Sequence, residues 1–103
     1  MKTFTKKRID IMVEAPLLNR LIDLLERQEV GGYTVVPAIA GKGTSGTWHR
    51  DGQVGRVGAV VQIFCIVDES RVDAILKPIF EMVAKQIGIV TVSDVEVIRP
   101  ENF

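Results

Sequence analysis

The sequence predicts an α+β domain of the ferredoxin-like class, in which two helices pack on one face of a four-stranded antiparallel sheet. Two observations lead to this prediction. Apolar residues recur with the period of a strand or of a helix in the order β-α-β-β-α-β along the chain. The chain also has 103 residues, 47% of them hydrophobic and 25% charged, which suits one domain with its own core. We therefore expect a single domain over residues 1–103.

The first strand and the first helix follow from two different periods. Apolar and other residues alternate over positions 8–13, as in a half-buried strand. Pro16 then fits the first turn of a helix, where its missing N–H costs nothing, and apolar residues recur at helical spacing up to Leu25. Glycine readily adopts the left-handed conformation of a helix C-terminal cap, so we expect Gly31-Gly32 to end this helix.

The next two strands are predicted over Tyr33–Ala40 and Val57–Val67, and we expect them to pair as the legs of an extended hairpin. Pro37 lacks the N–H that a central strand needs, so the first of them should end at a sheet edge or a bulge. The second is apolar at almost every position, which predicts that both of its faces are buried. Because two helices cover only one face of a sheet, we expect the chain to associate with copies of itself.

The second helix is predicted over Arg71–Gln86, after the segment Ser70–Asp73, which has the spacing of a capping box. Apolar residues then recur at helical spacing, and Pro78 is expected to bend this helix without ending it. Gly88 is expected to cap it. A last strand is predicted over Ile89–Ile98, with an interruption near its middle.

Charge and cysteine content narrow the class of function. The 13 cationic and 13 anionic residues balance, which argues against a dedicated nucleic-acid binder. Cys65 is the single cysteine, so an intramolecular disulfide is excluded, and its apolar surroundings predict a buried, unreactive thiol. The sequence shows neither a stretch resembling a signal peptide nor a run of apolar residues long enough to span a membrane. We therefore expect a cytoplasmic protein without direct membrane insertion.

The most informative segment is residues 41–58, which contains six glycines. A small domain rarely carries ~18 residues without secondary structure unless they are functional or disordered, so we expect a functional loop here. Gly41-Lys42-Gly43 could present backbone N–H groups and an ammonium group to a phosphate, although the spacing of a Walker A motif is absent. A flexible loop with one stray lysine is the alternative.

Two arginines are further candidates for an anion site. Arg56, at the foot of the loop, and Arg99, near the end of the chain, could each donate bidentate hydrogen bonds to phosphate. The alternative is that each covers apolar surface with its stem.

Catalytic signals are few. His49 is the only histidine and Asp51 is the only carboxylate in the loop, which excludes a multi-histidine metal site and disfavours a paired acid–base site. Trp48 has no apolar neighbours in sequence, so it is expected to contact a partner or to cover a ligand. The sequence therefore predicts a binding protein and not an enzyme, with no catalytic or metal-ligating residue to name.

Several of these motifs resemble those of PII-like signalling proteins, which are relatives of the nitrogen-regulatory PII trimers. The resemblance covers the whole chain. It is most specific in Gly32–Val35, in Gly41-Lys42-Gly43 and in Asp94–Arg99, and Val67–Asp73 is similar to the junction of the third strand and second helix in that family. The PII-like proteins associated with bicarbonate transporters and carboxysomes share the Gly-Tyr-Thr-Val and Gly-Lys-Gly pattern.

The resemblance implies a homotrimer that binds adenine nucleotides in the three clefts between subunits. It also implies a large T-loop, here about residues 41–58, that changes conformation with the ligand and contacts a target protein. The residues implied to bind nucleotide are Thr34 near the adenine, Gly41, Lys42 and Gly43 beside the phosphates, Gly88 and Ile89 in the remains of the B-loop, and Arg99 on the phosphates. Arg56 is added on its position alone, and Trp48, His49 and Arg50 are the expected partner contacts.

Three departures from the family pattern limit what is carried over. The segment after Gly41 lacks the glutamine that PII proteins use for magnesium and 2-oxoglutarate, and the loop has no tyrosine for uridylylation. Only Gln86–Ile89 stands in place of the longer B-loop. With fewer contacts to a γ-phosphate, ADP or AMP is expected to be preferred over ATP, and bicarbonate is a further candidate ligand.

The sequence is therefore interpreted as a trimeric sensor of adenylates, which regulates a target protein in inorganic-carbon uptake or fixation, such as a bicarbonate transporter. Two alternatives remain open. The first is a ferredoxin-like trimer of the copper-tolerance type that acts in metal binding or scaffolding. The second is a small enzyme that hydrolyses nucleotides slowly.

Overall fold

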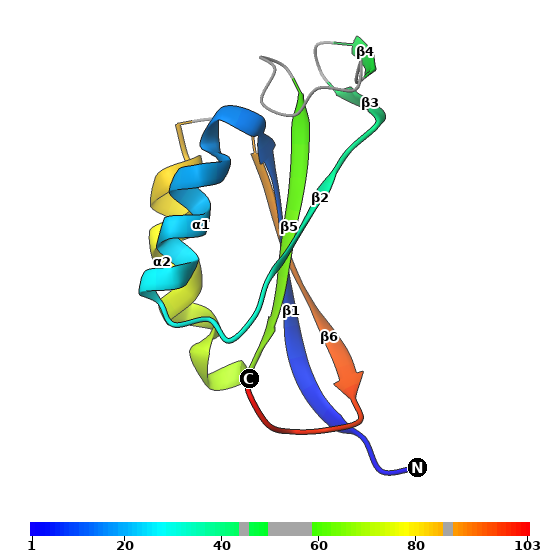
Figure 1. Cartoon of the computed structure of the whole chain (residues 1–103), viewed down its shortest axis with the longest axis vertical. Coiled ribbons are helices and arrows are strands. Elements are labelled where there is room, and N and C mark those ends of the chain that lie inside the picture. The colour runs from blue at the N-terminus through cyan, green and yellow to red at the C-terminus, as the bar shows by residue number, and fades with distance from the viewer. Residues whose placement is uncertain (44–45, 50–58, 86–87) are drawn as a thin grey trace.

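The computed structural model describes residues 1–43, 46–49, 59–85 and 88–103. Four strands form an antiparallel sheet in the order β2-β5-β1-β6, and two helices lie together on one face of it (Figure 1). The predicted fold class is therefore confirmed. The helices and strands are β1 (Phe4–Glu14), α1 (Leu18–Arg27), β2 (Thr34–Pro37), β3 (Ala40–Gly43), β4 (Gly46–His49), β5 (Val60–Val67), α2 (Val72–Val83) and β6 (Gly88–Val97).

The core lies between the helices and the two central strands. Ile9 of β1 is paired with Cys65 of β5, and Ile11 is paired with Ile63, so alternate residues of both strands point to the same face. These residues are buried, and the helices close the core with four side chains that are fully buried, namely Leu21, Leu25, Ile75 and Ile79. Burying one such aliphatic side chain contributes about 1.5–3 kcal/mol.

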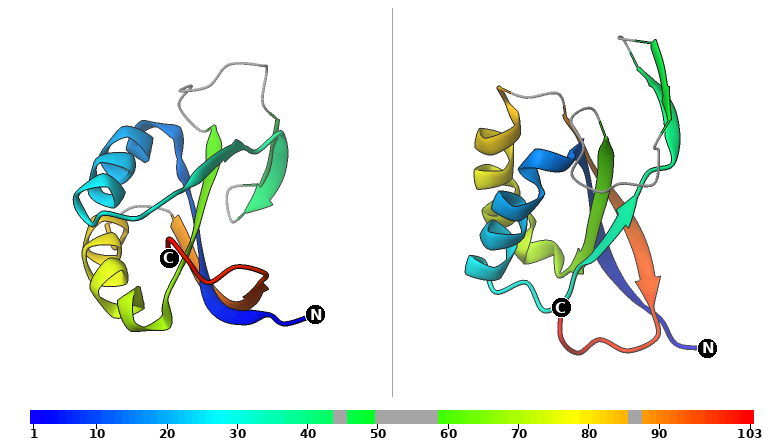
Figure 2. Two further views of the ribbon diagram at one scale, coloured as in Figure 1. Left: turned by 60° about the horizontal axis from the view of Figure 1, so that its bottom comes forward. Right: turned by 45° about the horizontal axis from the view of Figure 1, so that its top comes forward.

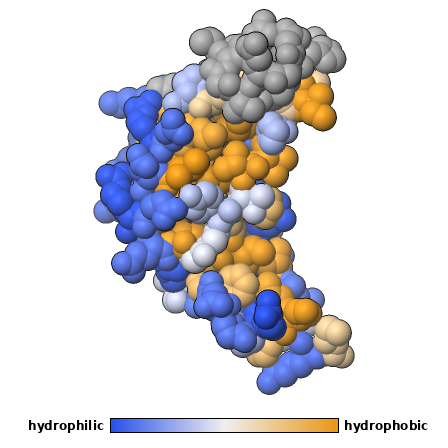
Figure 3. Space-filling view, viewed as in Figure 1, coloured by the Kyte–Doolittle hydropathy of each residue, from blue (hydrophilic) through white to orange (hydrophobic). Residues whose placement is uncertain are grey.

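The opposite face of the sheet is open in the single chain. In β5, the positions between the buried ones, such as Phe64 and Ile66, are only half-buried. The prediction that both faces of this strand are buried is thus not met within one chain, because both helices lie on the same side. Hydrophilic side chains cover the helical layer, whereas apolar side chains run along the sheet (Figure 3).

The end of α1 differs from the prediction. The left-handed residue is Glu29, with φ 55°, and not the glycine pair. Its N–H donates to the Glu26 carbonyl at 3.0 Å, and the Val30 N–H donates to the Leu25 carbonyl at 3.2 Å, which together make a Schellman motif. The Arg71 guanidinium also donates to the Gln28 carbonyl at 2.6 Å and so satisfies a further carbonyl at the helix end.

Gly31 has a different role. A Cβ atom added to Gly31 would lie 2.7 Å from the Asn102 carbonyl oxygen, so a side chain here would collide with the end of the chain. Gly32 faces open space, because nothing lies within 4 Å of the same added atom.

The second helix continues through Pro78, as predicted, but it ends at Val83 and not at Gln86. A short 3-10 turn over Glu69–Arg71 precedes it, and no side chain caps either element, so the predicted capping box does not form. Gly88 is the first residue of β6, opposite Val13, and is not a helix cap. β6 runs to Val97 without the predicted interruption.

The strand predicted over Tyr33–Ala40 is divided in two. β2 lies at the sheet edge, as Pro37 indicated, and Pro37 forms its last pair, with Val61 of β5. β3 then pairs with β4 in a separate two-stranded sheet, in which Gly41 lies opposite Trp48. The β3–β4 hairpin projects from the main sheet at the end where β1 ends and β6 begins (Figure 2). The expectation that residues 41–58 lack secondary structure is therefore wrong for residues 41–43 and 46–49. Neither α1 nor α2, the helices of the described residues, has the length and apolar character of a membrane-spanning helix.

Candidate functional site

A pocket of about 530 Å³ lies at the end of the sheet that is opposite the β3–β4 hairpin. Three segments enclose it: the start of β2, the second half of β5 and the segment that follows β6. The lining residues are Gly31, Gly32, Tyr33, Thr34, Phe64, Cys65, Ile66, Val97, Ile98, Arg99, Glu101, Asn102 and Phe103.

The end of the chain folds back to form one wall of this pocket. Asn102 adopts a left-handed conformation, with φ 73°, which asparagine tolerates better than most residues. The Phe103 carbonyl oxygen then accepts a hydrogen bond of 3.0 Å from the Asp68 N–H. Lys6 pairs with the Asp68 carboxylate, and its ammonium lies 5.8 Å from the centre of the Phe103 ring. These contacts, together with the close approach to Gly31, hold the wall in place.

The pocket combines an apolar surface with a few polar groups. Phe64, Ile66 and Val97 supply apolar area, while the Thr34 hydroxyl and the Arg99 guanidinium can form hydrogen bonds. Arg99 is exposed and forms no ion pair within the described parts of the chain, so it can bind an external anion. Such a pocket suits a flat ring that carries an anionic group.

Cys65 also lines the pocket but is unreactive. It is 3% exposed, and burial raises its pKa to about 11, so the thiol remains protonated at neutral pH. The prediction that this cysteine is buried is confirmed, and the raised pKa agrees with an unreactive thiol.

Two of the residues implied to bind nucleotide therefore meet in this pocket, namely Thr34 and Arg99. Gly41, Lys42 and Gly43 do not line it, because they belong to β3 in the hairpin. Gly88 and Ile89 begin β6, at the same end of the sheet as the hairpin. One chain thus carries two groups of candidate residues at opposite ends of its sheet.

The residues expected to contact a partner can be placed only in part. Trp48 and His49 are in β4, where they lie opposite Gly41 and Ala40. Arg50 and Arg56 lie outside the described residues. Within residues 1–43, 46–49, 59–85 and 88–103, no group of three or more His, Cys, Asp or Glu side chains could hold a metal ion.

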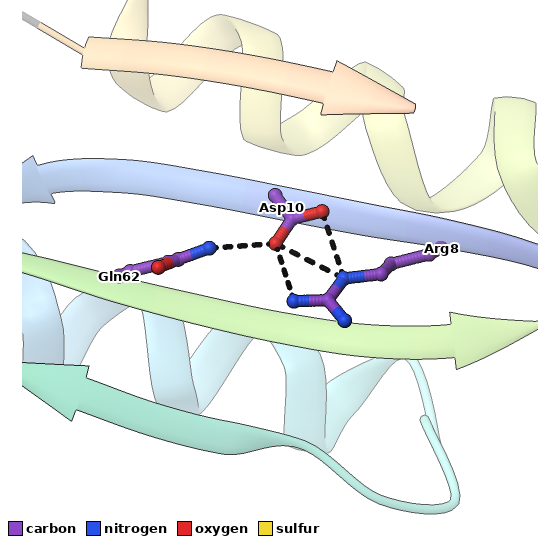
Figure 4. Close-up of polar contacts among 3 residues, drawn as sticks. All are labelled: Arg8, Asp10 and Gln62. Atoms are coloured by element: carbon purple, nitrogen blue, oxygen red, sulfur yellow. Dashed lines mark hydrogen bonds and ion pairs between the residues drawn. The ribbon is translucent and has the colours of Figure 1, made fainter. Parts of the chain in front are cut away.

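A polar cluster on the open face of the sheet was not predicted from the sequence. The Arg8 guanidinium donates to both Asp10 carboxylate oxygens at 3.0 Å, and the Gln62 amide donates to Oδ1 of Asp10 at 2.7 Å (Figure 4). Arg8 also stacks on Phe64, 4.1 Å from its ring centre. The Arg8 hydrogen bonds lower the pKa of the Asp10 carboxyl, against the effect of burial, and Gln62 adds to this. We name Arg8, Asp10 and Gln62 the sheet-face cluster.

Comparisons with known proteins identify the family. The model of the family described as nitrogen regulatory protein P-II matches residues 6–102. No curated protein sequence matches the chain significantly. Among solved structures, CPII from Thiomonas intermedia K12, bound to ADP and bicarbonate, is 31% identical, with a TM-score of 0.83 over 99% of this chain and 97% of that chain.

Two further solved structures are similar over nearly their whole length. One is CPII, described as a nitrogen regulatory PII-like protein, bound to ADP, AMP and bicarbonate. It is 30% identical, with a TM-score of 0.79 over 96% of this chain and 99% of that chain. The other is a putative PII-like signalling protein from Thermus thermophilus, which is 28% identical, with a TM-score of 0.76 over 94% of this chain and 93% of that chain. Because the family model spans nearly all of the sequence, the chain belongs to the nitrogen regulatory protein P-II family.

Proposed function

We propose that this protein is a non-enzymatic regulator that binds adenine nucleotides in clefts between copies of the chain. The observation that carries the proposal is the meeting of Thr34 and Arg99 in one pocket with an apolar wall. In the proposed complex, the purine ring packs against that wall, the Thr34 hydroxyl bonds to the edge of the ring, and Arg99 binds the phosphates.

The division of the candidate residues supports an assembled site. Gly41–Gly43, Gly88 and Ile89 lie at the other end of the sheet, so a neighbouring copy must bring them to the pocket. The open sheet face offers the apolar area for such an assembly, which we propose to be a homotrimer. Arg56 is proposed to join the same cleft.

Residues 41–58 are proposed to act as the T-loop. The β3–β4 hairpin projects beyond the main sheet, where it can reach another protein, and Trp48, His49 and Arg50 are the proposed contacts. Nucleotide bound beside Gly41–Gly43 would change the conformation of this segment and so switch partner binding.

A role in inorganic-carbon metabolism rests on the relatives. CPII structures hold ADP, AMP and bicarbonate, so we propose ADP or AMP as the ligands here, with ATP weaker and bicarbonate as a second ligand. The target protein would then act in bicarbonate uptake or fixation.

Calorimetric titration with AMP, ADP and ATP, each with and without bicarbonate, tests the proposal. Arg99→Ala should weaken ADP binding about 10-fold or more, since a hydrogen bond to a charged group contributes roughly 1.5–3 kcal/mol. Arg20→Ala, an exposed position on α1, is the matched control. Sedimentation should give a mass three times that of the 11.4 kDa chain. Absence of any heat with all three nucleotides at millimolar concentration would contradict the proposed function.

A further inference from the structure

We propose that Glu101 sets the nucleotide preference of this pocket by repelling the more highly charged adenylates. This inference rests on the proposed function and assigns a specificity-determining residue to the same site. Arg99 and Glu101 are the only charged side chains among the described residues that line the pocket. The side chains of this wall therefore carry one positive and one negative charge, and each additional phosphate on a ligand meets one attractive side chain and one repulsive side chain.

The backbone holds the two residues near each other. Only Pro100 separates them, so their Cα atoms are at most about 7 Å apart. No ion pair joins Arg99 to Glu101, and neither forms one with another described residue. Within the described residues, no ion pair therefore offsets the repulsion between the Glu101 carboxylate and a ligand that Arg99 holds.

The position of Glu101 is also fixed on both sides. Pro100 restricts the backbone before it. After it, Asn102 packs against Gly31, and the Phe103 carbonyl is bonded to the Asp68 N–H. The nearby ammonium of Lys6 is engaged by Asp68 and Phe103, so it does not neutralise Glu101. These contacts keep the Glu101 backbone beside the pocket.

The size of the effect follows from the charge of each ligand. A phosphate monoester carries about −1.5 to −2 charges at pH 7, and each further phosphate adds roughly one. One unit charge at about 7 Å in water changes an affinity by about threefold, and the effect falls as the distance grows. A neighbouring copy would also contribute Lys42 to the site. Because Lys42 is present in every variant compared, it does not affect the difference between them. Glu101 should thus disfavour ATP relative to AMP by about fivefold.

The test is calorimetric titration of the full chain with AMP, ADP and ATP at pH 7.5 and low salt, without divalent cations. Glu101→Gln removes the charge and keeps the shape, and Glu81→Gln, an exposed change on α2, is the matched control. We expect Glu101→Gln to strengthen ATP binding about fivefold more than AMP binding, with ADP between them. The difference should shrink in 0.5 M salt, because salt screens exposed charges. Glu101→Lys should enlarge it.

The outcomes are distinguishable. If Glu101→Gln changes all three affinities equally, or changes none, Glu101 does not select by charge and the inference is wrong while the proposed function stands. If the wild-type chain binds no nucleotide, both the proposed function and this inference are overturned.

Discussion

The two faces of the four-stranded sheet are built from the same strands but differ in kind. On the helix side, Ile11 and Ile63 are paired and fully buried in an apolar core. On the open side, Asp10 belongs to the sheet-face cluster and is paired with the half-buried Phe64. The first face needs only apolar side chains that fill space. The second face combines apolar area with a hydrogen-bonded charge pair. A neighbouring copy that covers this face must therefore match the geometry of that pair.

A substitution on the helix side of the sheet should have the largest effect on stability. Ile63→Ala should lower the free energy of unfolding by about 2–5 kcal/mol, because it removes a fully buried side chain and leaves a cavity. Urea denaturation at a fixed protein concentration measures this. Ile39→Ala, at a position 76% exposed, is the control and should change little. Equal losses for the two variants would show that the helix side is not the main core.

The next largest effect is expected at the pocket wall that the end of the chain forms, where Asn102 lies against Gly31. Gly31→Ala should cost about 1–3 kcal/mol, because its new methyl group would lie 2.7 Å from the Asn102 carbonyl oxygen and push the chain end away. Gly32→Ala is a matched control, since nothing lies within 4 Å of its added atom. The thermal unfolding temperature should fall for the first variant only. Equal unfolding temperatures for the two variants would mean that the end of the chain can move without loss of stability.

A change on the open face should affect assembly more than folding. Phe64→Ala removes the ring on which Arg8 stacks, which contributes about 0.5–1 kcal/mol at a partly exposed site. The far-ultraviolet circular dichroism spectrum should be unchanged, whereas sedimentation should show loss of the assembled species. Nucleotide affinity should fall as well, since Phe64 also lines the pocket. An assembled Phe64→Ala variant would place the interface elsewhere.

The smallest effect should depend on pH. Arg8 holds the pKa of the Asp10 carboxyl below its ordinary value, so the carboxylate stabilises the fold above the unfolded pKa of about 3.9. This contribution is lost as the pH falls through the lower, folded value. Asp10→Asn should therefore cost about 1 kcal/mol or less at pH 7, because the pair is partly exposed, and less at pH 2 than at pH 7. Urea denaturation at both pH values checks this, and a pH-independent loss would contradict it.

The order of strands and helices could be predicted because it follows from local periodicity, whereas the ends of the elements and the contacts between distant segments could not. Glu29 adopts a left-handed conformation that glycine would favour, and Arg71, far along the chain, supports it. The β3–β4 hairpin was missed because its glycine-rich strands carry little apolar alternation.

The residues of the candidate site were likewise predicted only in part. Thr34 was identified through family resemblance, and Arg99 through its side chain as well as that resemblance. The structure places them in one pocket. Glu101 carries no signal in the sequence, because its relevance depends on the chain end folding back over β5 and the start of β2. The sheet-face cluster was missed for a related reason, since Gln62 reaches Asp10 only through the pairing of β1 with β5.

The strand order also bears on how the chain is made. β1 is synthesised before the other three strands of the main sheet, yet its two neighbours, β5 and β6, are synthesised last of the four. Phe4 must wait for Val97, near the other end of the chain, before its pairing is complete. Until then both edges of β1 are unpaired and able to join strands of other nascent chains. The main sheet can therefore close only after β6 has been synthesised, and nascent chains that stall before β5 should depend on chaperones to remain unaggregated.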